Sequence, residues 1–251
     1  YNTFGTTEIR EQLVQVTMRV GQQSDVPEQS KVTFFEFARE EMNKELTRTP
    51  TTWRTLFTNN EPQLSNDARE YVIASALYRV AGLRKEALAL INRALELSPT
   101  KQPLIVDKAV ILMQMDDYKG ALLEAKRAYE LEPRSALARV TYISALIYNN
   151  QNEEADKIFN QGSGIPGVDQ EQILFAYVST GQLDKALELT KRRVAESPGY
   201  IQFRLSLAAI YLQLGQRQNA IKEIEETIKI DPNFKAQGDY YISEIRAGRN
   251  P

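Results

Sequence analysis

The sequence predicts an all-α solenoid of five stacked helical hairpins. Three observations predict it: an alanine recurs at a nearly constant spacing, a turn-forming residue lies five positions before each alanine, and a proline follows each hairpin. The alanines are Ala87, Ala121, Ala155, Ala186 and Ala220, separated by 34, 34, 31 and 34 residues. A period of this length is typical of repeat arrays, in which each unit buries its apolar face against its neighbours.

The residues between the alanines place the turns and the ends of the helices. The turn positions hold Gly82, Asp116, Asn150, Gly181 and Gly215. These residue types tolerate the left-handed backbone that ends a helix. The prolines are Pro99, Pro133, Pro166, Pro198 and Pro232. Each blocks continuation of the second helix, so the next hairpin begins after it.

The alanine register sets the boundaries of the elements in chain order. We expect repeats over 68–101, 102–135, 136–166, 167–200 and 201–234. Residues 1–67 predict a non-consensus hairpin that shields the first repeat, followed by a polar linker with a helical turn near Trp53. Residues 235–251 predict a capping helix and tail, in which Tyr241 and Ile245 cover the last repeat while Lys235, Glu244 and Arg246 remain in solvent.

The spacing of 31 residues has a local explanation in a glycine-rich segment, 162–167. Gly162, Gly164 and Gly167 match G-x-G-x-x-G, the dinucleotide-binding fingerprint. That fingerprint needs a preceding strand, whereas helical hairpins flank this segment and Pro166 removes one backbone N–H. We therefore interpret the segment as a loop after a shortened helix, and as a hinge within the array.

Together these positions resemble the pattern W-x2-L-G-x2-Y…A-x3-F…P of the tetratricopeptide repeat, over residues 68–234. The clearest copies are AREYVIASALYRVAGLRKEALALINRALELSPT and IQFRLSLAAIYLQLGQRQNAIKEIEETIKIDPNF. The resemblance implies a right-handed α-α superhelix in which the first helix of each repeat lines a concave groove. It also implies a protein-interaction scaffold that holds a partner polypeptide in that groove.

The family's groove positions are mostly apolar here. With the alanine at repeat position 20, the candidate partner-binding residues at positions 5, 9 and 12 are Val72, Ala76, Arg79, Val106, Val110, Met113, Val140, Ser144, Ile147, Phe175, Val178, Leu205 and Ala209. The same positions also hold Glu171 and Leu212. The lysines and asparagines of the family's chaperone-binding clamp are missing. We expect a protein or peptide ligand with apolar anchors.

Composition argues against most other functions. Cysteine and histidine are absent, which removes thiolate nucleophiles, the usual zinc sites and histidine-based acid–base catalysis. We expect no enzyme activity, no catalytic residue, no metal and no cofactor. The balance of 31 basic and 33 acidic residues gives no reason to expect nucleic-acid binding. No stretch approaches the roughly 20 apolar residues that span a bilayer.

An alternative function follows from the opening segment, YNTFGTTEIREQLVQ. It resembles the segment after the last membrane helix of bacterial O-antigen ligase or polymerase-like proteins that carry a tetratricopeptide tail. This resemblance implies an accessory tail of a membrane-bound glycan ligase or polymerase, tethered to the inner membrane through residues before Tyr1. Membrane helices encoded upstream of Tyr1 would favour this alternative over the general scaffold.

Overall fold

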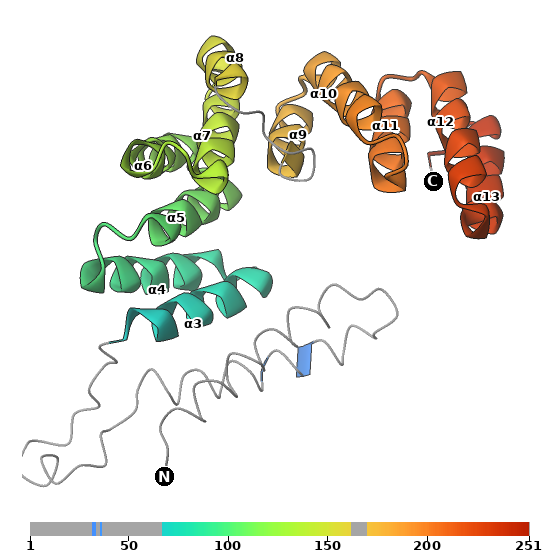
Figure 1. Ribbon diagram of the computed structural model, residues 1–251. Coiled ribbons are helices and arrows are strands. Elements are labelled where there is room, and N and C mark those ends of the chain that lie inside the picture. The colour runs from blue at the N-terminus through green and yellow to red at the C-terminus, as the bar shows by residue number, and fades with distance from the viewer. Residues whose placement is uncertain (1–31, 34–35, 37–66, 162–169, 251) are drawn as a thin grey trace, which may run out of the picture. The chain divides into compact units, whose positions relative to one another are not determined.

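The computed structural model describes residues 32–33, 36, 67–161 and 170–250, and these residues contain helices and turns but no strand (Figure 1). The predicted all-α class of helical hairpins is confirmed. The predicted N-terminal hairpin, the turn near Trp53 and the glycine-rich segment lie outside the described residues. The chain divides into two compact units, Tyr1–Pro133 and Arg134–Pro251.

Unit 1 contains two hairpins in its described part. Its helices are α3 (Ala68–Val80), α4 (Arg84–Leu97), α5 (Gln102–Gln114) and α6 (Tyr118–Leu131). α3 packs against α4 and α5 against α6, while α4 also contacts α5. Asp67 and Asp117 cap α3 and α6, because their side chains accept backbone N–H groups of the first turn.

The described part of unit 2 contains three hairpins and a terminal helix. Its helices are α7 (Ala136–Tyr148), α8 (Asn152–Asn160), α9 (Glu171–Ser179), α10 (Leu183–Glu196), α11 (Ile201–Gln213), α12 (Arg217–Ile230), the 3-10 turn η3 (Pro232–Phe234) and α13 (Lys235–Arg246). α9 packs against both α7 and α10, and α10 contacts α11. Consecutive hairpins of this unit therefore share interfaces, as a solenoid requires.

Every predicted turn position has a left-handed backbone. The φ angles at Gly82, Asp116, Asn150, Gly181 and Gly215 are 75, 61, 58, 72 and 72°. The left-handed conformation costs Asp and Asn less energy than most other residues with a side chain, which explains why they replace glycine in two turns. The turn chemistry of the sequence thus determined where each first helix ends.

The recurring alanines are fully buried in the second helix of every hairpin. Ala87, Ala121, Ala155, Ala186 and Ala220 are all 0% exposed. In the first hairpin the Ser75 hydroxyl also donates to the Ala87 carbonyl oxygen at 2.8 Å, so a small polar residue at position 8 finds a partner on the facing helix. A larger side chain at position 20 would force the helices apart.

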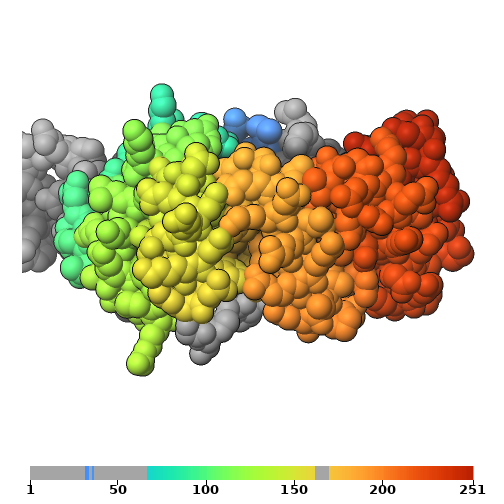
Figure 2. All heavy atoms as spheres, turned by 90° about the horizontal axis from the view of Figure 1, so that it is seen from above, coloured from blue at the N-terminus to red at the C-terminus, as the bar shows by residue number. Residues whose placement is uncertain are grey.

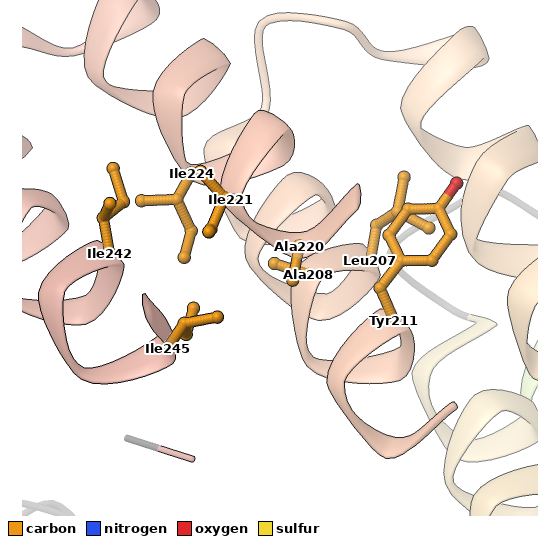
Figure 3. Packing of buried hydrophobic residues seen from close by; sticks show 8 residues of the cluster. All are labelled: Leu207, Ala208, Tyr211, Ala220, Ile221, Ile224, Ile242 and Ile245. Atoms are coloured by element: carbon orange, nitrogen blue, oxygen red, sulfur yellow. The ribbon is translucent and has the colours of Figure 1, made fainter. Parts of the chain in front are cut away.

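α13 covers the end of the last repeat. Figure 3 shows Ile242 and Ile245 of α13 facing Ile221 and Ile224 of α12. Tyr241, which we predicted to cover this surface, packs at its edge, while Ile242 is buried and was not predicted. Lys235 and Arg246 are exposed as expected, whereas Glu244 is half-buried and pairs with Arg249.

Two further contacts hold the C-terminal helix in place. Gly238 is buried, and a Cβ there would lie 2.7 Å from the Ile228 side chain, so glycine lets α13 approach α12 closely. The Arg217 guanidinium at the start of α12 donates to the carbonyl oxygens of Ile245, Gly248 and Arg249. Ile245 lies in the last turn of α13, and Gly248 and Arg249 follow the helix, so Arg217 acts as a cap on its C-terminal end.

α8 is short. It has 9 residues, whereas α4, α6, α10 and α12 have 14 each. The 31-residue spacing predicts a shortened second helix in this hairpin, and α8 is shorter than the other second helices.

Candidate functional site

Two first helices of unit 2, α9 and α11, carry exposed stripes. On α9 the exposed residues are Glu171, Phe175 and Ser179, which are spaced four apart and therefore lie on one side of the helix. On α11 the exposed residues are Gln202, Ala209 and Gln213. These stripes are the surfaces on which a polypeptide can contact the first helices.

Predicted site residues of unit 1 differ in exposure. Val72, Ala76, Arg79 and Val110 are half-buried. Val106 and Met113 are only 1% and 8% exposed, because their side chains pack between helices. The structure therefore leaves Val110 as the apolar candidate on α5 that a ligand can reach.

Asp107 is a polar residue of the same α5 surface that the sequence reasoning did not select. Burial raises the pKa of its carboxyl group, and the charge of Arg79 on α3 opposes part of that rise. A half-buried carboxylate next to Val110 gives this otherwise apolar surface one acidic point. The sequence signal that could have identified Asp107 was its position in the repeat, directly after the candidate residue Val106.

The predicted site residues of unit 2 differ more strongly in exposure. Val140, Ser144 and Ile147 are buried within α7, where the Ser144 hydroxyl donates to the Val140 carbonyl oxygen at 2.9 Å. Phe175 on α9 is 65% exposed. Val178 and Leu205 are half-buried and Ala209 is exposed. The reachable candidates of this unit therefore lie on α9 and α11.

The Phe175 surface carries few charges. Glu171 is the single charged residue of α9, and Arg204 is the single one of α11. Arg204 pairs with Glu223 of α12 at 2.8 Å, and the two side chains are 17% and 19% exposed. Glu171 therefore supplies the accessible charge of these two stripes.

Glu171 is held by a buried arginine that the sequence reasoning missed. The Arg193 side chain, from α10, is 2% exposed and donates to Glu171 Oε2 at 2.5 Å. Its guanidinium carbon lies 4.1 Å from the centre of the Phe203 ring of α11. Arg193 thus connects three helices. The sequence signal was an arginine at a position of α10 that otherwise faces the core.

The outer surface of unit 2 is hollowed between α8 and α10. Figure 2 shows the yellow atoms of α8 beside the orange atoms of α10. The hollow has a volume of about 220 Å³ and is lined by Asp156, Phe159, Asn160, Tyr177, Lys185, Glu188, Leu189 and Arg192. It is lined by residues of α8, α9 and α10.

Much of the charge in this hollow is already engaged. Lys185 pairs with Asp156 at 2.5 Å, and the Tyr177 hydroxyl donates to the same carboxylate at 3.4 Å. Burial, helped by the charge of Asp156, raises the pKa of Tyr177, which keeps the hydroxyl protonated as a donor. The Arg192 guanidinium stacks 4.6 Å from the centre of the Phe159 ring. These contacts join α8 to α9 and α10, so the residues that line the hollow link two consecutive hairpins.

The described residues contain no cluster of three or more acidic side chains that could hold a metal ion. They also contain no helix that is long and apolar enough to cross a membrane. The opening segment, on which the glycan-ligase alternative depends, lies outside the described residues.

Comparison with known proteins identifies the repeat. Residues 177–239 match the family model of the tetratricopeptide repeat. The chain is 27% identical over 172 residues to the BBSome complex member BBS4 of Bos taurus, a match that covers 66% of this chain and 33% of that protein. The chain therefore spans about a third of the length of this relative.

Solved structures show the same fold. A tetratricopeptide repeat protein from Parabacteroides merdae superposes with a TM-score of 0.53 at 15% identity, covering 88% of this chain and 79% of that one. A chain of the APC/C hetero-tetramer Cut9–Hcn1 superposes with a TM-score of 0.50 at 14% identity, covering 86% and 40%. The predicted resemblance to the tetratricopeptide repeat is confirmed.

Proposed function

We propose that this chain of tetratricopeptide repeats is a scaffold that binds a partner polypeptide on the exposed stripes of its first helices, with Phe175 as the apolar anchor point of unit 2. The observation that carries the proposal is the 65% exposure of Phe175. A phenylalanine of this exposure leaves apolar area in water, and covering a side chain of this size contributes about 1.5–3 kcal/mol.

The surroundings of Phe175 favour a polypeptide over a small molecule. Val178, Leu205 and Ala209 add apolar area on the same two helices, and glutamines and serines at the stripe edges offer hydrogen bonds. An apolar centre with a neutral polar rim is typical of protein interfaces. Phe175 lies on an open helix face, whereas small ligands favour enclosed pockets.

The relatives give a second reason for the proposal. One is named as a member of the BBSome complex, and one solved structure is a subunit of the APC/C hetero-tetramer. Both names describe assemblies of several proteins. A role as one subunit of an assembly fits a chain whose exposed stripes bear apolar residues.

The test is a selection of twelve-residue peptides displayed on phage against the full chain. Binding of the enriched peptides is then measured on the wild type and on three variants: Phe175→Asp, Tyr240→Asp and Leu123→Asp. Tyr240 on α13 is 57% exposed and Leu123 on α6 is 69% exposed, so both are matched controls away from the stripe of α9. Circular dichroism of each variant checks that it folds.

We expect Phe175→Asp to weaken binding at least about tenfold, because a charge replaces an apolar side chain that the partner covers in the complex. The two control variants should bind as the wild type does. A chain that enriches no peptide, or a Phe175→Asp variant that binds the enriched peptides normally, would contradict the proposal.

A further inference from the structure

We infer that the polypeptide segment bound on α9 carries a basic side chain that pairs with Glu171, next to the apolar residue that covers Phe175. This inference rests on the function proposed above and specifies the chemistry of the partner. It is carried by the way Arg193 holds Glu171 at the end of the exposed stripe.

Glu171 is a positioned acceptor with one oxygen available. Its Oε2 accepts the hydrogen bond from Arg193, whereas no hydrogen bond to its Oε1 occurs within the described part of the chain. The Glu171 side chain is 65% exposed although its partner is 2% exposed. The carboxylate therefore points one oxygen inward to the buried guanidinium and leaves the other for a ligand.

Preorganisation makes this carboxylate different from an ordinary surface glutamate. A free glutamate loses side-chain entropy when it is fixed in an interface, and that loss offsets the energy of a surface ion pair. Arg193 is itself fixed, because it is buried and stacks on Phe203. Glu171 has therefore lost this freedom before any ligand binds.

The accessible charges of the protein determine which charge the ligand should carry. Arg193 is buried, and Arg204 is engaged by Glu223. On α10, Lys191 and Arg192 rest over the rings of Tyr211 and Phe159. Glu171 is thus the outermost charge on the stripes of α9 and α11, and a basic group is attracted to it.

An acidic ligand at Arg193 is the competing possibility, because its Nε and Nη1 have no hydrogen-bond partner. Both atoms are shielded from solvent, however, and Glu171 occupies the remaining nitrogen, Nη2. An acidic group would have to displace Glu171 and would meet its negative charge. The geometry therefore favours a basic group that adds to the pair.

Helix geometry sets the spacing of the two contacts. Glu171 and Phe175 are one turn apart, which is about 6 Å along the axis of α9. In an extended partner, side chains on the same face repeat at about 6.6–6.8 Å, so the basic and apolar residues would be two positions apart. In a helical partner they would be three or four positions apart.

The experiment uses the peptides enriched on the wild-type chain. We expect lysine or arginine at one of these spacings from an aromatic or aliphatic residue. A peptide in which glutamine replaces that basic residue should bind the wild type about three- to tenfold more weakly, as for a single ion pair at a partly covered site. This comparison needs no variant of the protein.

A double-mutant cycle then assigns the contact to Glu171. Glu171→Gln should weaken binding of the basic peptide by the same factor and leave binding of the glutamine peptide unchanged. Glu153→Gln, at an exposed carboxylate of α8, is the matched control and should change neither. Circular dichroism checks that Glu171→Gln, which keeps an oxygen for Arg193, remains folded.

The outcomes separate this inference from the proposed function. Enriched peptides with an acidic residue at that spacing, or a cycle without coupling between Glu171 and the basic residue, would overturn the inference. If Phe175→Asp still abolished binding in that case, the proposed function would stand without it. Binding that is indifferent to Phe175 would contradict the proposed function itself.

Discussion

At the scale of single residues, backbone conformation and volume decide which positions tolerate change. The turn glycines have positive φ, and the position-20 alanines have no exposed surface. Both constraints act on one residue at a time, so they recur in every hairpin regardless of what a hairpin binds. Matched pairs of substitutions can therefore test each constraint.

The first prediction compares two alanines of α4. Ala87 is 0% exposed and Ala89 is exposed. Ala87→Leu should lower the free energy of unfolding by about 1–3 kcal/mol, because the added side chain overpacks the hairpin. Ala89→Leu should change it by less than about 0.5 kcal/mol. Urea denaturation measures both, and equal effects would show that Ala87 is not at a close helix approach.

A second prediction compares two glycines of unit 2. A Cβ would meet nothing within 4 Å at either Gly181 or Gly199, but Gly181 alone of the two has a positive φ, of 72°. Gly181→Ala should cost about 1–2 kcal/mol because an L side chain is strained there. Gly199→Ala should be neutral or stabilising. If thermal unfolding showed the same shift for both, backbone strain would not explain the turn glycines.

At the scale of elements, the length and covering of each helix decide its local stability. α8 is five residues shorter than the other second helices, 9 against 14. α13 by contrast is held by apolar packing on α12 and by the Arg217 cap. The two elements should therefore open at different rates, although both lie in unit 2.

Hydrogen exchange tests the stability of α8. Solenoid stability depends on interfaces between neighbouring elements, and a short helix contributes a smaller interface. Amides of Asn152–Asn160 should exchange faster than those of α10 and α12. Uniform protection through these helices would count against the hinge that the sequence predicts next to α8.

A substitution in α13 tests the terminal cap. Ile245 is 1% exposed, so Ile245→Ala should lower the free energy of unfolding by about 2–5 kcal/mol through lost burial and the cavity it leaves. Tyr240→Ala, on the exposed side of the same helix, should cost far less. Denaturation curves that coincide for the two variants would show that α13 does not cover the last repeat.

At the scale of the whole molecule, each unit has its own first-helix surface that a ligand could reach. In unit 1 the reachable apolar residue of α5 is Val110, which is half-buried, beside the acidic Asp107. In unit 2 it is Phe175, beside Glu171. Both surfaces combine apolar area with one carboxylate, so binding should depend only weakly on salt concentration.

Val110→Arg tests the surface of unit 1. The change should weaken binding of an identified partner by on the order of 2 kcal/mol, because it places a charge at a contact that must be desolvated. Leu123→Arg, on α6 of the same unit, should leave the affinity unchanged. Calorimetry at low and high salt concentration measures both the loss of affinity and its dependence on salt. A folded Val110→Arg variant that binds normally would show that the ligand uses another surface, and an unfolded one that Val110 is a packing residue.

The sequence by itself determined the helical class, the repeat period, the five turns and the buried alanines. These features follow from local backbone conformation and from a spacing that each hairpin repeats, so they can be recognised without knowing what a hairpin packs against. The family resemblance rested on the same positions, and it placed Phe175 among the candidates for binding.

Only the tertiary structure decided which candidates a ligand can reach. Ser144 and Phe175 occupy the same repeat position, yet Ser144 is 0% exposed and Phe175 is 65% exposed. Exposure depends on neighbours that lie a helix or more away in the sequence, and α7 contacts both α8 and α9. Arg193 likewise reaches Glu171, 22 residues earlier, and no local pattern encodes a contact between side chains of two helices.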